Sequence, residues 1–145
     1  MKWPTRRIGA AAAVFDDEGR VLLVRHTYGP LNWEVPGGAS EPGESVVETA
    51  LRELREETGL DAEAESLTGI YWNAERDAHH FVFLCRATDG HAPAPSSPEI
   101  SDCAWFSPEE LPRPISDFTT RRIQDALTAR PQPLPIPVPP RTFLD

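Results

Sequence analysis

A chain of 145 residues can bury one full-sized hydrophobic core and is too short for two ordinary domains. Its hydrophobic share of 39% and charged share of 26% are typical of a soluble globular protein, and no apolar run approaches the roughly 20 residues of a membrane-spanning helix. The net charge of -9 argues against an open surface for nucleic-acid polymers, which need a basic patch. We therefore expect neither a membrane nor a nucleic-acid polymer as a partner.

Two features bear on the cellular compartment. Three basic residues precede an apolar stretch at 8–15, as in a secretory signal, but the stretch is short and acids follow it at once. We interpret this stretch as a buried first strand. Cys85 and Cys103 lie in strand-like stretches and are expected to be buried, reduced thiols, which indicates a cytoplasmic protein.

The beginning of the chain predicts strands. Residues 6–15 and 20–26 are expected to form two strands that the turn at 16–19 joins into a hairpin. A short strand is expected at 33–36, and the segment Pro36-Gly37-Gly38 should break it.

The pattern becomes helical from about Glu44 to Thr58, and Gly59 supplies the stop. Apolar residues recur there at i, i+3, i+4 and i+7 on one face, at Val47, Ala50, Leu51 and Leu54.

Further elements are expected downstream. Strand-like runs occur at 67–74, 79–87 and 100–106, the segment 107–112 predicts a short helical turn, and an amphipathic helix is expected over 117–130. The fold class is therefore α+β, with a mixed sheet whose faces are covered by two helices.

The last residues form a separate kind of segment. We expect a globular domain over 1–130 and a tail over 131–145, where closely spaced prolines favour an extended polyproline conformation and exclude a helix. Such a tail could be flexible, it could pack against its own domain or a neighbouring copy, or it could be a recognition peptide for another protein. A homodimer is accordingly among the expected assemblies.

The C-terminal end of the first helix is unusually acidic. At 100° per residue, Glu53, Glu56 and Glu57 share one flank beside the apolar stripe. A like-charge pair at i, i+4 costs a few tenths of a kcal/mol, and negative charge at a helix C-terminus costs about 0.3–1 kcal/mol. Arg52 offsets only part of this unfavourable energy. A divalent cation would offset the rest, because carboxylate oxygens are the ligands that magnesium and manganese prefer. The alternative is a solvated acidic face.

The residues around this helix match a known signature at all nine of its constrained positions. These are Gly38, Glu44, Arg52, Glu53, Leu54, Glu56, Glu57, Gly59 and Leu60. With this pattern, the Nudix box, the chain resembles the Nudix hydrolases, and the likeness extends over most of residues 6–128. The resemblance implies an α/β/α sandwich and magnesium-dependent hydrolysis of a phosphoanhydride bond in a nucleoside diphosphate linked to another group, with Mn²⁺ as an alternative cofactor.

The resemblance also implies roles for individual residues. Glu53, Glu56 and Glu57 match metal-binding carboxylates, and Arg52 matches an arginine that orients them by salt bridges. Gly38 matches a loop glycine whose lack of a side chain lets a backbone carbonyl approach the metal. Two further positions of the signature are Glu44, which closes the loop before the helix and in some relatives assists a metal, and Gly59, the helix stop.

The attacking water needs a general base. Glu99 lies on a loop before a predicted strand, where many relatives place a further metal-binding or catalytic glutamate, and Glu56 and Glu57 are its rivals for this role. We assign Arg52, Glu53, Glu56, Glu57 and Glu99 to catalysis.

Residues outside the helix are candidates for substrate contacts. We assign Arg25, Tyr28 and Glu44 to substrate binding, with Tyr28 as the candidate to stack on a nucleobase. His79 and His80 are adjacent on a predicted strand and point to opposite faces, so they are not expected to hold a metal together.

Two residues that mark particular substrates in relatives are absent here. Relatives that cut ADP-ribose often carry a proline, and those that cut diadenosine polyphosphates carry a tyrosine, in a window after the signature. Here that window reads Glu75-Arg76-Asp77-Ala78 and contains neither residue. A small nucleotide such as a nucleoside triphosphate or a modified nucleotide is therefore favoured, with ADP-ribose as the alternative. A non-catalytic nucleotide-binding regulatory module is the alternative of another class, disfavoured because every acid of the signature is present.

Overall fold

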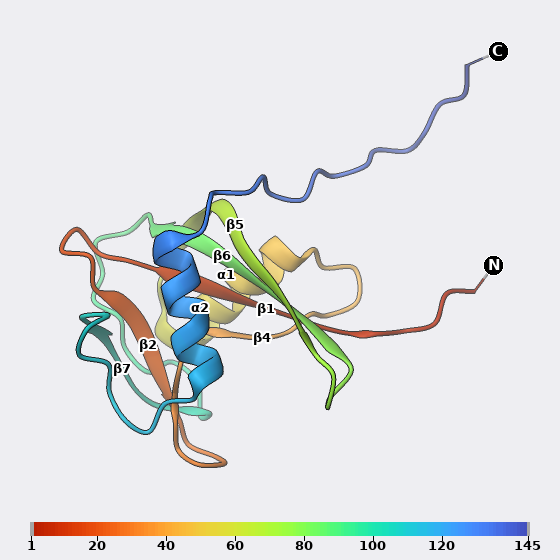
Figure 1. The fold of residues 1–145 in the computed structure, drawn as a ribbon. Coiled ribbons are helices and arrows are strands. Elements are labelled where there is room, and N and C mark those ends of the chain that lie inside the picture. Colours follow the sequence, from red (N-terminus) through yellow and green to blue (C-terminus); the bar gives the residue numbers. More distant parts are fainter. Residues whose placement is uncertain (1, 145) are drawn as a thin grey trace.

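The computed structural model describes residues 2–144 and shows two sheets with two long helices (Figure 1). The elements, in chain order, are β1 (Arg7–Val14), β2 (Val21–His26), β3 (Trp33–Glu34), β4 (Gly37–Ala39), α1 (Val46–Thr58), β5 (Ala62–Asn73), β6 (Ala78–Ala87), β7 (Ile100–Phe106) and α2 (Asp117–Thr128). No helix among these residues is both long enough and apolar enough to cross a bilayer.

The strands form a four-stranded sheet in the order β4-β1-β6-β5 and a three-stranded sheet in the order β3-β2-β7. The larger sheet is mixed, because β1 runs parallel to β6 and antiparallel to β4. Helix α1 packs against this sheet mainly at β1 and β4, and α2 packs at β5 and β6. The predicted α+β sandwich of a mixed sheet between two helices is confirmed.

Strand β1 contributes to the two larger hydrophobic cores. Ala10, Ala12 and Val14 belong to the core beneath α1, whereas Ala11 and Ala13 belong to the core that includes Ile123 of α2. Successive side chains of a strand point to opposite faces, so a run of small apolar residues can be buried on both sides. The apolar stretch near the N-terminus is thus an inner strand, as predicted.

One prediction about the first strands is wrong. The strands β1 and β2 do not form a hairpin ladder; they belong to different sheets and share only the bridge between Phe15 and Val21. The predicted break at Pro36 is confirmed, because β3 ends at Glu34. The residues that follow, Gly37–Ala39, were not expected to form a strand, but they form β4 and pair with β1 in the other sheet. The long parallel pairing of β1 with β6 occupies the edge that a hairpin partner would need.

Helix boundaries follow the capping residues more than the apolar pattern. Ser45 caps α1 and forms a capping box with Glu48, so the helix begins two residues after the predicted Glu44. Gly59 ends α1 in the left-handed conformation, with φ 77°. Helix α2 ends at Thr128, slightly earlier than predicted.

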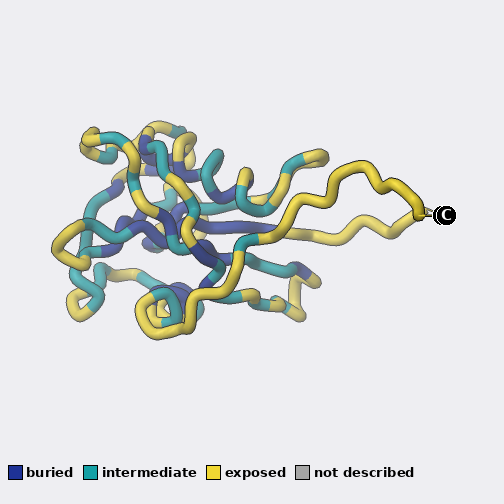
Figure 2. The backbone as a smooth tube through the Cα atoms, turned by 90° about the horizontal axis from the view of Figure 1, so that it is seen from above, coloured by how far each residue is buried: buried dark blue, intermediate teal, exposed yellow. Residues whose placement is uncertain are grey.

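The segment 107–112 forms no helical turn. Ser107 accepts a hydrogen bond from the Glu110 amide, which makes a simple turn. The N-terminal residues and the last residues leave the folded body as exposed, extended segments (Figure 2).

The close approach of β4 to β1 gives a testable prediction. A Cβ added at Gly37 would lie 2.6 Å from the Ala10 carbonyl oxygen and 2.8 Å from the Ala11 Cα, which are backbone atoms that cannot move aside. We expect Gly37→Ala to lower the free energy of unfolding by about 1–3 kcal/mol. The matched control, Gly90→Ala, adds a methyl group in open space and should change it by less than about 0.5 kcal/mol. Equal urea midpoints for the two variants would contradict this packing.

Candidate active site

Arg52 organises the acidic end of α1. Its guanidinium donates to both oxygens of Glu44, with Nε 2.6 Å from Oε2 and Nη2 3.0 Å from Oε1. Its Nη1 donates to Glu53 at 3.0 Å and to Glu56 at 3.2 Å. The hydrogen bonds from Arg52 hold the pKa of Glu44 at about 2. A planar fork of five N–H donors can order three carboxylates at once, which a lysine cannot do.

Glu57 is the buried member of the acidic trio. Only 5% of the residue is exposed, and its Oε1 accepts a hydrogen bond from the Gly37 amide at 2.8 Å. Burial, reinforced by the charges of Glu53, Glu99 and Glu34, raises the pKa of Glu57 to about 8 in spite of this bond. Without a bound cation, the Glu57 carboxyl therefore carries a proton at neutral pH.

Glu53 lies against the backbone of the short strand β4. A Cβ at Gly38 would be 2.6 Å from the Glu53 Cδ, so the glycine leaves the space that the carboxylate occupies. Burial raises the pKa of Glu53, and the ion pair with Arg52 opposes that rise. The structure thus brings Gly38, Glu53 and Glu57 together, whereas Glu56 projects outward with about half of its side chain exposed.

Glu99 approaches this cluster from the loop before β7. Its carbonyl oxygen accepts the Thr27 amide at 2.8 Å, which ties that loop to the segment after β2. The charge of Glu99 contributes to the raised pKa values of Glu53 and Glu57. Burial, followed by the charge of Glu99, also raises the pKa of Tyr28. Both predicted loop residues therefore lie within electrostatic reach of Glu53 and Glu57.

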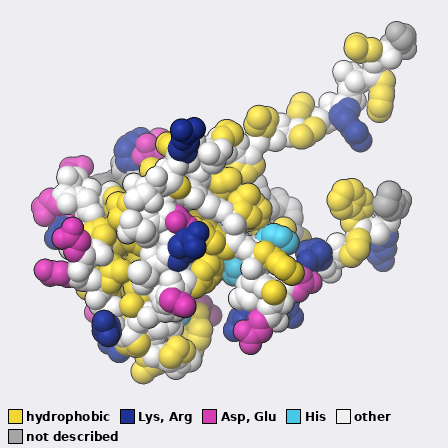
Figure 3. Space-filling model, in the orientation of Figure 1, with side chains coloured by type: hydrophobic (Ala, Val, Ile, Leu, Met, Phe, Trp, Pro, Cys, Tyr) yellow, Lys and Arg dark blue, Asp and Glu magenta, His cyan; other side chains and the backbone are white. Residues whose placement is uncertain are grey.

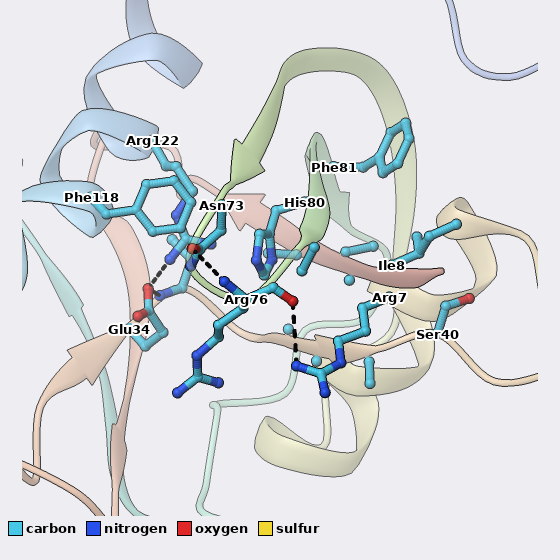
Figure 4. Close-up of a pocket in the computed structure, with 18 of the residues that line it drawn as sticks. Arg7, Ile8, Glu34, Ser40, Asn73, Arg76, His80, Phe81, Phe118 and Arg122 are labelled. Atoms are coloured by element: carbon cyan, nitrogen blue, oxygen red, sulfur yellow. Dashed lines mark hydrogen bonds and ion pairs between the residues drawn. The ribbon is translucent and has the colours of Figure 1, made fainter. Parts of the chain in front are cut away.

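A cavity of about 670 Å³ opens beside the acidic cluster. Gly37 and Gly38 form one end of it, and the other walls come from β1, the turn between β5 and β6, and α2 (Figure 4). The side chains that define its chemistry are Arg7, Tyr28, Arg76, His80, Phe118 and Arg122. This volume is in the range of pockets that bind small organic ligands.

One wall contains an ion pair that the sequence did not predict. Glu34 pairs with Arg122 and also accepts a hydrogen bond from Thr119 at 2.6 Å. The Arg122 guanidinium lies 4.1 Å from the centre of the Phe118 ring, in a cation–π contact. Phe118 and Arg122 are four residues apart on α2, and this spacing is the only local signal that they share a face.

The remaining candidates are placed as follows. The Arg25 Nε donates to the Leu31 carbonyl at 3.0 Å, and Arg25 is not among the residues that line the cavity. His79 stacks near Trp72, whereas His80 faces Phe118, so the two histidines point to opposite faces as predicted.

The acidic cluster is suited to a divalent cation that keeps several water molecules among its ligands. Among residues 2–144, no three His, Cys, Asp or Glu side chains form a ready-made metal cage. Magnesium does not require one, since it keeps several waters and takes one or two carboxylates plus substrate phosphates. The hydrogen bonds of the described residues use one oxygen each of Glu53, Glu56 and Glu57 and leave the other oxygen available. This donor set fits magnesium or manganese.

Comparison with known proteins identifies the family. The NUDIX domain model matches residues 5–127, and the chain belongs to this family. A MutT-like protein of Streptomyces ambofaciens is 32% identical over 124 residues, covering 86% of this chain and 79% of that protein. A putative 8-oxo-dGTP diphosphatase of Bacillus subtilis is 35% identical over 117 residues, or 81% of this chain and 77% of that protein. The crystal structure of an ADP-ribose pyrophosphatase from Streptococcus suis is similar, with a TM-score of 0.70, 27% identity and coverage of 85% and 90%.

The raised pKa of Glu57 predicts a specific pH dependence of stability in the presence of a chelator. The native state keeps the Glu57 proton up to about pH 8, whereas the unfolded chain loses it near pH 4.5. Between these values the unfolded state binds fewer protons, so stability falls as pH rises, by up to about 1.4 kcal/mol per pH unit. We expect Glu57→Gln to remove this slope in urea unfolding from pH 5 to 8. Glu65→Gln, on the exposed side of β5, is the control. Parallel curves for wild type and Glu57→Gln would contradict the burial of a protonated carboxyl.

Proposed function

We propose that this protein hydrolyses a phosphoanhydride bond in a nucleoside diphosphate linked to another group, with Mg²⁺ as cofactor and Mn²⁺ as an alternative. The observation that carries the proposal is the position of Glu53 and Glu57. Both carboxyls are partly or fully buried against the Gly37-Gly38 backbone. These two glycines line the cavity, although the two carboxyls themselves do not. A cluster of acids there would repel a phosphate unless cations joined the two.

Glu53, Glu56 and Glu57 are the residues that would hold the metal, with the Gly38 backbone beside them. When bound, the cation neutralises the diphosphate and polarises the bond to be cleaved. Arg52 makes no substrate contact in this proposal. It fixes the orientation of Glu53 and Glu56, and through Glu44 it anchors the loop that precedes α1.

Glu99 is proposed as the base that accepts the proton of the attacking water. Water adds through its oxygen to phosphorus, the bridging P–O bond breaks, and the proton passes to a carboxylate. Glu99 is exposed on a loop held by the Thr27 amide and lies within electrostatic reach of Glu53 and Glu57. Glu56, which is also largely exposed, is the rival for this role.

The cavity is proposed to hold the nucleoside. Phe118 and Tyr28 offer aromatic faces for a base, and Arg7 and Arg76 supply positive charge to an otherwise acidic protein. We propose a nucleoside triphosphate or a modified nucleotide as substrate. The resemblance to a putative 8-oxo-dGTP diphosphatase supports this choice. ADP-ribose is the alternative, supported by the structural similarity to an ADP-ribose pyrophosphatase. We place the activity in the cytoplasm.

Metal binding should be visible in thermal stability. A ligand that binds only the native state stabilises it by RT ln(1 + [L]/Kd), which is about 2.7 kcal/mol at 100 times the Kd. We expect saturating Mg²⁺ to raise the melting temperature of the wild type by several degrees. Glu53→Gln should show little or no rise, and Glu65→Gln should behave as wild type. Identical melting curves with chelator and with Mg²⁺ would count against a metal site here.

Turnover should require the same carboxylates. With Mg²⁺ and a panel of nucleoside triphosphates, oxidised guanine triphosphate and ADP-ribose, we expect Glu53→Gln and Glu57→Gln to lower kcat by at least about 100-fold. Glu65→Gln is the matched isosteric control and should retain wild-type rates. Product analysis by ion-exchange chromatography distinguishes nucleoside triphosphate cleavage from ADP-ribose cleavage. Unchanged turnover in both site variants would refute the assignment, and binding without turnover by the wild type would favour a regulatory module.

A further inference from the structure

Glu34 presents one free carboxylate oxygen to the cavity. Its Oε1 accepts three hydrogen bonds, from the Val35 amide at 3.2 Å, from the Thr119 hydroxyl at 2.6 Å and from the Arg122 guanidinium. Its Oε2 accepts none from the described residues and remains accessible, and Glu34 lines the cavity on the side of α2 (Figure 4). An ionised carboxylate has acceptor sites only. The cavity therefore contains a fixed hydrogen-bond acceptor that a ligand can use.

The support behind this oxygen argues for a role beyond stability. Arg122 is only 6% exposed, its guanidinium lies 4.1 Å from the centre of the Phe118 ring, and its Nε has no hydrogen-bond partner among residues 2–144. Burial lowers the pKa of Arg122, and the charge of Glu34 opposes that fall. A buried ion pair with an unsatisfied donor is often no more stable than apolar side chains of the same volume. The pair is better explained by the orientation that it gives to the Glu34 carboxylate.

Glu34 differs in position from the acidic side chains on the surface. Figure 3 shows acidic side chains spread over the outer surface, where water solvates them. The Glu34 side chain is only 20% exposed. Burial raises the pKa of Glu57 and of Tyr28, and the charge of Glu34 adds to both shifts. Glu34 therefore lies in the cavity within electrostatic reach of the buried member of the acidic trio.

We propose that Glu34 binds the hydrogen-bond donor edge of the substrate's base and selects guanine over the other bases. Guanine presents two adjacent donors, the N1–H and the exocyclic amino group, whereas adenine presents the lone pair of N1 beside its amino group. A carboxylate oxygen attracts the first edge and repels the lone pair of the second. This selection rests on the proposed function, because it assumes a nucleotide whose diphosphate lies at Glu53 and Glu57.

The remaining bases fit this acceptor less well than guanine does. Cytosine resembles adenine, with a ring nitrogen lone pair beside its amino group, and thymine has one N–H between two carbonyl oxygens. Oxidation of guanine at C8 leaves the donor edge unchanged, because N1 and the exocyclic amino group lie on the opposite side of the purine. Glu34 therefore binds guanine and its C8-oxidised form alike.

Binding of nucleoside monophosphates tests the selection without hydrolysis, because they contain no phosphoanhydride bond. Isothermal titration calorimetry of the full chain in Mg²⁺ compares guanosine monophosphate, adenosine monophosphate and inosine monophosphate, which lacks only the exocyclic amino group of guanine. We expect guanosine monophosphate to bind at least about 10-fold more tightly than either of the others. Equal Kd values for the three, or binding of none, would overturn the proposal.

Glu34→Gln should shift the preference toward adenine. The three donors around Oε1 require the amide oxygen of the glutamine at that position, so its NH₂ group takes the place of Oε2 and faces the cavity. A donor there attracts the adenine N1 lone pair and repels the guanine N1–H. We expect the preference for guanosine over adenosine monophosphate to fall at least about 10-fold, and the matched control Glu65→Gln to keep the wild-type preference.

A merely structural role for Glu34 would weaken the binding of both monophosphates equally in Glu34→Gln, and that result would contradict the proposal. If this variant does not fold, as circular dichroism would reveal, the comparison of the three monophosphates in the wild type decides the question.

Turnover separates this selection from the proposed function. With Mg²⁺, we expect the wild type to hydrolyse guanosine triphosphate with a kcat/KM at least about 10-fold above those for inosine and adenosine triphosphates, with the difference in KM. Equal kcat/KM values for the three would refute the base selection and leave the hydrolysis standing. Selective binding of guanosine monophosphate by a chain that hydrolyses none of the triphosphates would refute the hydrolysis and support the base selection.

Discussion

The arrangement of the acidic helix end depends on how one arginine is shared. Arg52 donates to Glu44, Glu53 and Glu56 and, through Nη2, to the Ala39 carbonyl. Its five N–H donors are then all used, and none is left for Glu57. Glu57 is instead buried against the Gly37 amide, where its ionised form is disfavoured by burial and by neighbouring charge. The protein therefore holds a carboxyl that is neutral without a cation and that the proposed function makes a metal ligand. Such a site gains from metal binding twice, through coordination and through relief of repulsion.

The strands near this site carry small side chains. β1 is a run of small residues, and β4 contributes Gly37 and Gly38, so the backbone of the sheet approaches α1 closely. A side chain at Gly38 would clash with Glu53. A side chain at Gly37 would push β4, whose Gly37 amide binds Glu57, away from β1. The same two strands line the cavity, and the loop carrying Glu99 is tied to the segment after β2 by the Thr27 amide. The proposed metal ligands, the proposed base and the cavity thus come from separate elements of the fold.

Local signals predicted the helix and its acids well. Periodicity, the Gly59 stop and the spacing from Gly38 to Leu60 all lie within one short segment, where neighbours in sequence are neighbours in space. The pairing of strands was predicted poorly, because the parallel ladder of β1 with β6 joins residues about half the chain apart and leaves no local trace. The Glu34–Arg122 ion pair was missed for the same reason. Arg25 was assigned to substrate binding from the sequence, yet its side chain donates to the Leu31 carbonyl and does not line the cavity.

Proton release on metal binding distinguishes a protonated Glu57 from an ionised one. If Glu57 is protonated near neutral pH and becomes a ligand, Mg²⁺ binding must expel that proton into the buffer. Calorimetric titration with Mg²⁺ at pH 7, in two buffers of different ionisation enthalpy, measures the number of protons released. We expect the wild type to release close to one proton and Glu57→Gln to release none. Metal binding by the wild type with no proton release would contradict it.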